Sequence, residues 1–326
     1  MQDLVFALNA VCPIVLLVAL GYFLKRIGII PKELAKPLNK IVFRVLLPAM
    51  LFNNVYNIPT VENIELGYVA YAAAVIAIAF VIGFLLSPLL TRERSRRAIL
   101  IQTFFRSNFA LIGISLATSI AGTAGAERAT LLSAVSIPML NVFAIIALST
   151  FDPSGERPSV KKILRGIITN PLILSIGAGL FALGVRYLLG AFEMEFSLYE
   201  AFPPIQKSLS YLSGAATPIA LLTLGAQFEF SAVGNMKREI IAGTLIRTFI
   251  VPAAALAVSL LFDFTPGVYA AFIGVFTTPL AVSSVPMAQE MGSDSELCGQ
   301  LVIFTTLASG IGIFLFTWVM KTLGAF

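Results

Sequence analysis

The sequence has no histidine and only two cysteines among its 326 residues. Histidine is the usual general base and proton relay of proteins, so proton chemistry here would fall to a carboxylate or to water. Cys12 and Cys298 show no CxxC or Cys/His spacing, which argues against a structural disulfide or a zinc site. We therefore expect no metal and no cofactor.

Charge is also scarce. Charged residues make up 12% of the chain and apolar residues 58%, and the mean hydropathy is +0.93, whereas ordinary soluble domains are about 25% charged. The apolar residues gather in stretches of about 20, each long enough to cross a hydrocarbon core of about 30 Å. The sequence therefore predicts an all-α integral membrane protein surrounded by a lipid bilayer.

The apolar stretches predict ten transmembrane helices. The first is expected to be a membrane helix rather than a signal peptide, because it lacks a basic n-region and a small-residue cleavage site. The ten predicted segments are 4–24, 37–57, 66–90, 97–121, 128–150, 165–187, 205–227, 238–262, 266–289 and 299–323.

The connecting loops alternate between basic and acidic along the chain. Loops rich in Lys and Arg stay in the cytoplasm, so we expect both termini outside the cell and the chain in the plasma (inner) membrane. Because the net charge of +5 follows this alternation, we expect no nucleic-acid partner. One loop does not fit: the stretch around Asp294 and Glu296 should be cytoplasmic but has no basic residue.

A long polar connection divides the ten segments into two sets of five. We expect residues 1–150 to form a first five-helix repeat, residues 151–163 a cytoplasmic connecting loop, and residues 164–326 a second five-helix repeat within one membrane domain. An odd number of helices in each half gives the two halves opposite orientations, so the predicted repeat is inverted. Weak matches between the halves favour it, and they pair Pro13 with Pro171, Gly21 with Gly179, and Pro48 with Pro218.

Polar residues interrupt the fourth and ninth segments at matching places. The stretch "FFRSNFALIGIS" (104–115) corresponds to "FTTPLAVSSVP" (276–286) in the second half. Pro279 and Pro286 each lack a backbone donor, and both could simply kink a packed helix. Broken helices at matching places in inverted halves are, however, typical of a transporter's substrate site, because irregular backbone at membrane depth needs protein or a water-filled cavity to satisfy it.

Arg106 lies nine residues beyond Arg97 in the fourth segment, about 14 Å deeper at helical rise. Two roles are open to it: contact with an anion, which we favour, or support of the unwound backbone. The predicted substrate-binding residues are Asn108, Ser107, Arg106, Thr277, Thr278, Pro279, Ser283, Asn53 and Asn141. Glu290 is the one acidic residue near this predicted site, so Glu290 and Gln289 are the candidates for coupling to an ion.

At these residues the sequence resembles the auxin efflux carrier family of membrane transporters. The similarity covers "LLPAMLF" in the second segment, "SNFALIG" in the fourth and "TTPLAVSSVPMAQEMG" in the ninth. The resemblance implies two inverted five-helix repeats whose unwound fourth and ninth helices cross, with Asn108 and Pro279 at the crossing. The chain has Ser107 where plant members have proline, and its short middle loop indicates a prokaryotic member.

We therefore expect a secondary transporter, by resemblance an efflux carrier, of small organic anions such as carboxylates or auxin-like weak acids. It would work by alternating access around the crossing. A sodium- or proton-coupled carrier and a ligand sensor that does not transport are the alternatives, and a homodimer is considered as a further partner. An enzyme is not expected, because paired aspartates, a Ser/Lys arrangement and an HExxH motif are all missing from the apolar segments.

Overall fold

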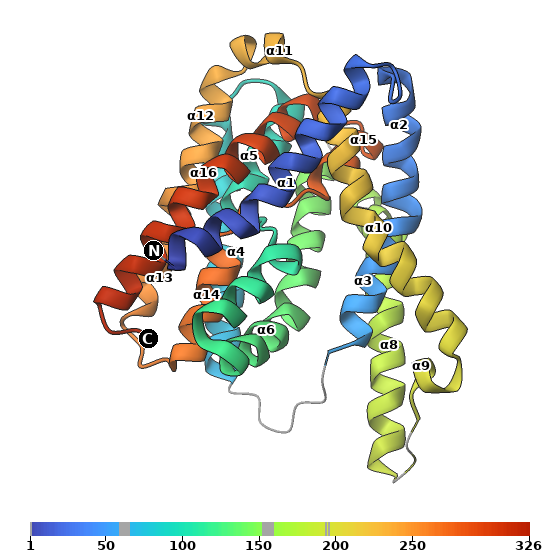
Figure 1. Ribbon diagram of the computed structural model, residues 1–326, viewed down its shortest axis with the longest axis vertical. Coiled ribbons are helices and arrows are strands. Elements are labelled where there is room, and N and C mark those ends of the chain that lie inside the picture. Colours follow the sequence, from blue (N-terminus) through green and yellow to red (C-terminus); the bar gives the residue numbers. More distant parts are fainter. Residues whose placement is uncertain (1, 59–65, 152–159, 193, 195) are drawn as a thin grey trace.

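A computed structural model describes residues 2–58, 66–151, 160–192, 194 and 196–326 (Figure 1). These residues form helices without a named strand, and one isolated antiparallel bridge joins Ser107 to Leu280. The all-helical prediction is confirmed for this part of the chain. Most of the predicted connecting loop 151–163 and the acidic stretch 59–65 lie outside the described residues.

The described part of the first half contains six α-helices and two π-helical turns. They are α1 (Gln2–Arg26), α2 (Lys32–Ile41), η1 (Val42–Leu46), α3 (Leu47–Tyr56), α4 (Leu66–Leu90), α5 (Arg94–Phe105), η2 (Phe109–Gly113) and α6 (Ile114–Thr150).

The described part of the second half continues in the same way. Its elements are α7 (Val160–Ile168), α8 (Pro171–Ala191), α9 (Leu198–Ala201), α10 (Pro203–Gln227), α11 (Phe230–Asn235), α12 (Lys237–Leu245), η3 (Ile246–Ile250), α13 (Val251–Ser259), α14 (Pro266–Thr277), α15 (Ser284–Glu290) and α16 (Ser295–Thr322).

Helices occupy each of the ten predicted segments. Within the described ranges, six helical stretches are long and apolar enough to cross a membrane, which fits the membrane prediction, while the full count of ten crossings stays a prediction. The six are Leu66–Leu90, Phe109–Thr150, Pro171–Gly190, Pro203–Gln227, Lys237–Ser259 and Ser295–Thr322.

Two predicted boundaries are wrong. The sixth segment was expected from residue 165, but α8 begins only at Pro171, where the missing N–H favours a helix start and the Asn170 side chain accepts a hydrogen bond of 2.9 Å from the backbone N–H of Leu172. The predicted gap between 121 and 128 is a kink inside α6. Gly122 has φ of +59° there, which glycine adopts at no steric cost.

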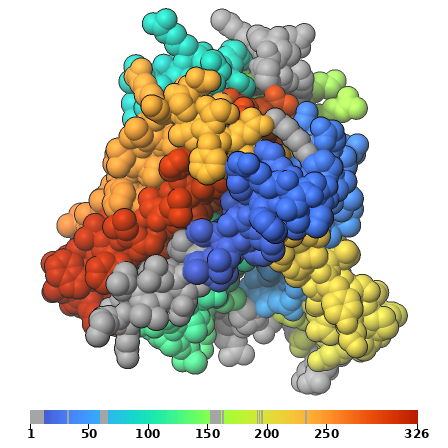
Figure 2. All heavy atoms as spheres, turned by 45° about the horizontal axis from the view of Figure 1, so that its top comes forward, coloured from blue at the N-terminus to red at the C-terminus, as the bar shows by residue number. Residues whose placement is uncertain are grey.

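The helices form two groups. Helices α1, α2, α3, α8 and α10 pack on one another and are called the panel below, while α4, α5, α6, α12, α13, α14, α15 and α16 form the core bundle (Figure 1). Figure 2 shows α1 lying across the face of the molecule between α16 and α10, both of which it contacts. The panel therefore covers one side of the core bundle.

Close crossings in the panel occur at the two glycines that the sequence comparison matched. A Cβ atom on Gly21 of α1 would lie 2.1 Å from the backbone oxygen of Leu222 in α10, and one on Gly179 of α8 would lie 3.0 Å from the side chain of Val55 in α3. The α1–α10 and α8–α3 pairs are the contacts that an inverted repeat would make equivalent.

The predicted polar interruptions are real breaks in the helices. α5 ends at Phe105 and helical structure resumes at Phe109, while α14 ends at Thr277 and α15 begins at Ser284. The extended pieces between them meet, and the backbone N–H of Asn108 donates to the carbonyl oxygen of Pro279 at 2.8 Å. Each break therefore satisfies part of the other's backbone.

The loop that lacked a basic residue is held by an arginine from the first turn of α5. Arg96 makes ion pairs with Glu93 at 2.9 Å, with Asp294 at 3.1 Å and with Glu239 at 3.2 Å. Burial tends to lower the pKa of Arg96, but the hydrogen bonds to Asp294 and Glu239 outweigh it and raise that pKa above its ordinary value. Asp294 thus lies beside a basic residue in space although not in sequence.

Gly113 and Gly274 provide a test of how closely the core bundle packs. A Cβ on Gly274 would lie 2.5 Å from the backbone oxygen of Gly113, and backbone cannot move aside cheaply. We expect Gly274→Ala to destabilise the protein by about 1–3 kcal/mol, measured as a lower melting temperature in detergent.

Gly177→Ala in α8 is the matched control, because nothing lies within 4 Å of its added Cβ. The alanine should leave the melting temperature unchanged or raise it slightly, since alanine is the better helix former by about 1 kcal/mol. Equal melting temperatures for the two variants would contradict the close crossing.

Candidate functional site

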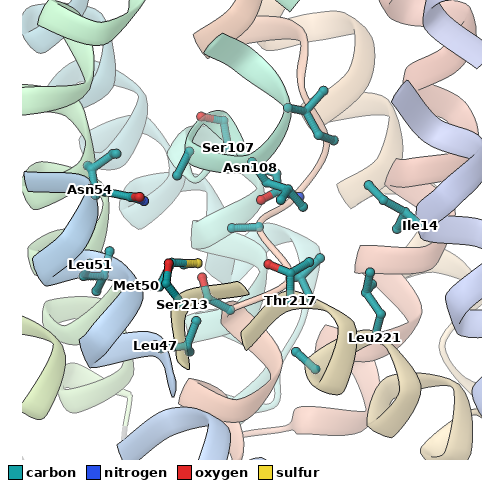
Figure 3. Close-up of a pocket in the computed structure, with 18 of the residues that line it drawn as sticks. Ile14, Leu47, Met50, Leu51, Asn54, Ser107, Asn108, Ser213, Thr217 and Leu221 are labelled. Atoms are coloured by element: carbon teal, nitrogen blue, oxygen red, sulfur yellow. The ribbon is translucent and has the colours of Figure 1, made fainter. Parts of the chain in front are cut away.

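A cavity of about 670 Å³ lies between the panel and the core bundle (Figure 3). Its panel side comes from α1, α3 and α10, and is mostly apolar, with Ile14, Leu47 and Leu221 among its residues. Its bundle side comes from the two helix breaks and from α6. The cavity is therefore bounded on its bundle side by the two breaks, the one between α5 and η2 and the one between α14 and α15.

Two buried polar groups at the first break have no partner among the described residues. These are the hydroxyl of Ser107 and the side-chain amide nitrogen of Asn108, and both residues line the cavity. Ser107 is 4% exposed and Asn108 is 7% exposed. Because a buried polar group without a partner costs about 1–3 kcal/mol, this end of the cavity favours a ligand that accepts hydrogen bonds.

Arg106 is directed to protein acceptors on both sides of the crossing. Its Nη1 atom donates to Gln102 Oε1 at 3.1 Å and to the sulfur of Met287 at 3.0 Å, and its Nη2 atom donates to Asn141 Oδ1 at 3.2 Å and to Ser283 Oγ at 3.1 Å. These four acceptors lie on α5, α6 and α15 or just before α15. The contacts match the second of the two roles considered for Arg106, support of the unwound backbone.

The remaining predicted residues of the ninth break face their own helix. Thr277 and Thr278 donate to the carbonyls of Ile273 and Gly274, at 2.7 and 3.0 Å. Arg247, which is fully buried, donates to the carbonyl of Phe276. These bonds occupy the last carbonyls of α14, where a helix leaves acceptors unsatisfied, so the threonines close a helix end rather than line the cavity.

Asn53 lies outside the cavity, and its neighbour Asn54 lines it instead. Asn53 Oδ1 accepts hydrogen bonds from Tyr199 at 2.7 Å and from Asn57 at 3.0 Å. Burial, together with the nearby Tyr56, raises the pKa of Tyr199 to about 12, so its phenol remains a donor at neutral pH. Adjacent residues of a helix point in directions about 100° apart. The sequence pattern alone did not predict which of the two asparagines faces the cavity.

Sequence reasoning also missed Ser213 and Thr217 of α10. Both line the cavity (Figure 3). The sequence held a signal. Pro13, which was matched with Pro171, and Pro218, which was matched with Pro48, both line the cavity, and Thr217 is adjacent to Pro218. A polar residue next to a proline that recurs in both halves therefore indicated a position facing the cavity.

The two ion-coupling candidates lie away from the large cavity. Glu290 forms an ion pair of 3.2 Å with Arg44, whose side chain is 60% exposed. Gln289 Oε1 accepts hydrogen bonds from the amides of Asn39 at 2.9 Å and Gln227 at 3.2 Å. Both side chains therefore already have protein partners.

An all-helical membrane protein with two broken helices meeting beside a central cavity has the build of a membrane carrier. The model of the family described as "Membrane transport protein" matches residues 6–317. The chain belongs to this family, which is the auxin efflux carrier family that its motifs resemble.

Similar proteins carry transporter names. The chain is 24% identical to an uncharacterized transporter of Methanocaldococcus jannaschii, over 96% of this chain and 98% of the relative. It is 23% identical to an uncharacterized transporter of Methanothermobacter thermautotrophicus, again over 96% and 98%. It is 25% identical to a protein of Rhizobium meliloti named "Putative malonate transporter", over 92% of this chain and 91% of the relative.

The contacts of Arg106 give a prediction that separates its two roles. Arg106→Ala removes the charged donor from several buried acceptors, each costing about 1–3 kcal/mol when left unmet. We expect a loss of roughly 2–4 kcal/mol, seen as a lower melting temperature in detergent both with and without a carboxylate present.

Arg238→Ala is the control, because Arg238 is an exposed arginine with a single bond to the carbonyl of Leu89 and should change stability little. If Arg106→Ala melts like the parent and loses only ligand binding, Arg106 contacts the anion and is not the support of the crossing.

Proposed function

We propose that the protein is a secondary transporter of small organic anions that bind where the two broken helices cross. The observation that carries this proposal is the pair of unpartnered groups on Ser107 and Asn108 at the bundle end of the cavity. Both groups can donate a hydrogen bond, and a carboxylate offers two oxygens that accept. The two donors therefore suit an acceptor such as a carboxylate and do not suit a cation.

The backbone at this break adds to the attraction. Asn108 precedes η2, which continues into the 37 residues of α6. The first N–H groups of a helix lack intrahelical partners and carry a partial positive charge, which favours an anion. Arg106 is among the residues that line the same cavity, and its guanidinium contributes a full positive charge while it keeps its hydrogen bonds to the protein.

The architecture supports alternating access by an inverted repeat of residues 1–150 and 164–326. The matched glycines Gly21 and Gly179 mark the equivalent pairs α1–α10 and α8–α3. The cavity lies at the boundary of the panel and the core bundle, so movement of one group against the other would change which end of the cavity is open. In this proposal the ten segments cross the plasma membrane and both termini lie outside.

The proposed substrates are small organic anions as a class. The name of the Rhizobium meliloti relative supports a carboxylate and makes malonate one of the compounds to test. The cavity volume of about 670 Å³ lies within the usual range of about 300–1,000 Å³ for small-molecule sites. A sensor on the same fold would bind such an anion without moving it, and flux in sealed vesicles separates that alternative.

Asn108→Ala tests the site directly. Removing a hydrogen bond to a charged group costs about 1.5–3 kcal/mol, so affinity for the anion should fall roughly tenfold or more. The measurement is the thermal shift that a panel of mono- and dicarboxylates produces in wild type and variant.

Asn57→Ala is the matched control, because Asn57 is exposed and bonds Asn53 outside the cavity. It should keep the wild-type response to every compound. If no anion in the panel stabilises wild type, or if Asn108→Ala responds as wild type does, the crossing is not an anion site.

The partners of Glu290 give a prediction about ion coupling. Glu290 is paired with Arg44, so the carboxylate is already neutralised by a protein cation. We expect anion flux in reconstituted vesicles to depend little on an imposed sodium gradient and to respond to membrane voltage. Strict sodium dependence that disappears in Glu290→Gln would instead support the cation-coupled alternative.

A further inference from the structure

A second, smaller cavity of about 150 Å³ lies beyond the first. Lys36, Gln227, Gln289 and Gln300 are among the residues that line it. Its lining residues come from α2, the end of α10, α15 and the start of α16. Figure 1 shows α2 and α15 toward the same end of the molecule as α11. The connections from α1 to α2, from α4 to α5 and from α11 to α12, which contain or directly adjoin basic residues, lie at this end (Figure 1).

Three separate stretches of the chain each line the large cavity at one end and the small cavity at the other. On α10, Leu221 lines the large cavity and Gln227 the small one. On the stretch from α3 back to α2, Leu47 lines the large cavity and Lys36 the small one.

The ninth segment repeats this order. Ser283, directly before α15, lines the large cavity, and Gln289 at the other end of α15 lines the small one. Three elements that are far apart in sequence thus lead from the first cavity to the second. Such an arrangement is expected of one continuous path that is closed in the middle.

A cluster of neutral polar side chains lies between the two cavities. Thr223 Oγ1 donates to Asn39 Oδ1 at 2.9 Å, Asn39 Nδ2 donates to Gln289 Oε1 at 2.9 Å, and Gln227 Nε2 donates to the same Gln289 oxygen at 3.2 Å. Gln289 Nε2 donates to the carbonyl of Lys36 at 3.3 Å. Asn39 and Thr223 are 0% exposed, so water does not pass through the cluster in this structure.

We infer that the side chains of Asn39, Thr223, Gln227 and Gln289, the polar latch, form the closed gate between the large cavity and a cytoplasmic mouth that is the small cavity. This inference rests on the proposed transport function. The organic anion would leave or enter through the small cavity, past Lys36, when the latch opens.

The distribution of the contacts explains why the latch can open. All four acceptors of Arg106 belong to the core bundle, so they move with it as one body. The latch is different, because Asn39 and Gln227 belong to the panel whereas Gln289 belongs to α15 of the core bundle. Any shift between panel and bundle must break these bonds.

The chemistry of the latch also suits a gate. Its groups are uncharged amides and a hydroxyl, which exchange a protein partner for water at little net cost when the path opens. The ion pair of Arg44 with Glu290 spans the same boundary, but Arg44 is largely exposed and such pairs contribute little. The hydrogen bonds of Gln289 therefore determine whether the gate is closed.

The test uses an impermeant maleimide on the full-length protein in sealed vesicles of both orientations. Cys12 and Cys298 are replaced (Cys12→Ser, Cys298→Ala), and a single probe, Thr217→Cys, is placed on the wall of the large cavity. A separate Lys237→Cys protein identifies the face from which the reagent is added, because Lys237 is exposed and is the first residue of α12, just after α11.

In the parent, the probe should react from the face opposite Lys237 and slowly from the Lys237 face. Gln289→Leu removes every hydrogen bond of the latch that involves α15, and should raise the rate from the Lys237 face about tenfold or more. A tenfold change is about 1.4 kcal/mol. Gln227→Leu, which removes one bond, should raise the rate by less and covers the case in which Gln289→Leu does not fold.

Gln300→Leu is the matched control. Gln300 lines the same small cavity, but its bond goes to the carbonyl of Glu229 and not to Gln289, so the parental rate is expected. Unchanged labelling in Gln289→Leu and Gln227→Leu, or an equal rise in Gln300→Leu, overturns the latch. Failure of the proposed function gives a different result. In that case no carboxylate slows maleimide labelling of Thr217→Cys, and no carboxylate raises the melting temperature of the protein.

Discussion

The structure depends on the need of every backbone N–H and C=O group in hydrocarbon to find a partner within the protein. Two helices are interrupted, and their interruptions leave backbone groups without helical partners. The two interruptions meet, and the backbone N–H of Asn108 donates to the carbonyl oxygen of Pro279. Two buried arginines supply further donors: Arg247 donates to a carbonyl at the end of α14, and Arg106 donates to Ser283 in the second break and to Met287 of α15. The polar centre is thus a consequence of broken backbone, and its few remaining free donors make it suitable for a ligand.

The cavity beside this polar centre exists because the molecule is divided into panel and core bundle, and residues of both groups line it. Among the described side chains, the buried charged ones are Arg106 and Arg247, which lie with the crossing in the core bundle. The panel presents to the cavity an apolar surface with scattered hydroxyl and amide groups. Close glycine contacts hold α1 on α10 and α8 on α3, so the panel is tightly packed internally. Few polar contacts join the two groups, which leaves the boundary between them as the place where the molecule can change shape.

The sequence predicted those features that are local in the chain. The breaks after Phe105 and Thr277 were predictable because polar residues and a proline interrupt apolar runs there. The bounds of α4 were predicted as observed because no cluster of polar residues interrupts its apolar run. The inward face of α3 was not predictable, since Asn53 and Asn54 differ only in rotation about the helix. Bonds such as that from Asn39 to Gln289 join residues too far apart in sequence for any pattern to reveal them.

The bond between Asn108 and Pro279 also bears on how the chain is made. When the ribosome has produced α5 and α6, the acceptor for the Asn108 N–H does not yet exist, and it appears only after most of the second half has been synthesised. The nascent first half must therefore keep this break in contact with water or with the insertion machinery until the ninth segment arrives. The backbone of the fourth segment thus obtains this hydrogen bond only after residue 279 has been made, although Asn108 itself emerges early.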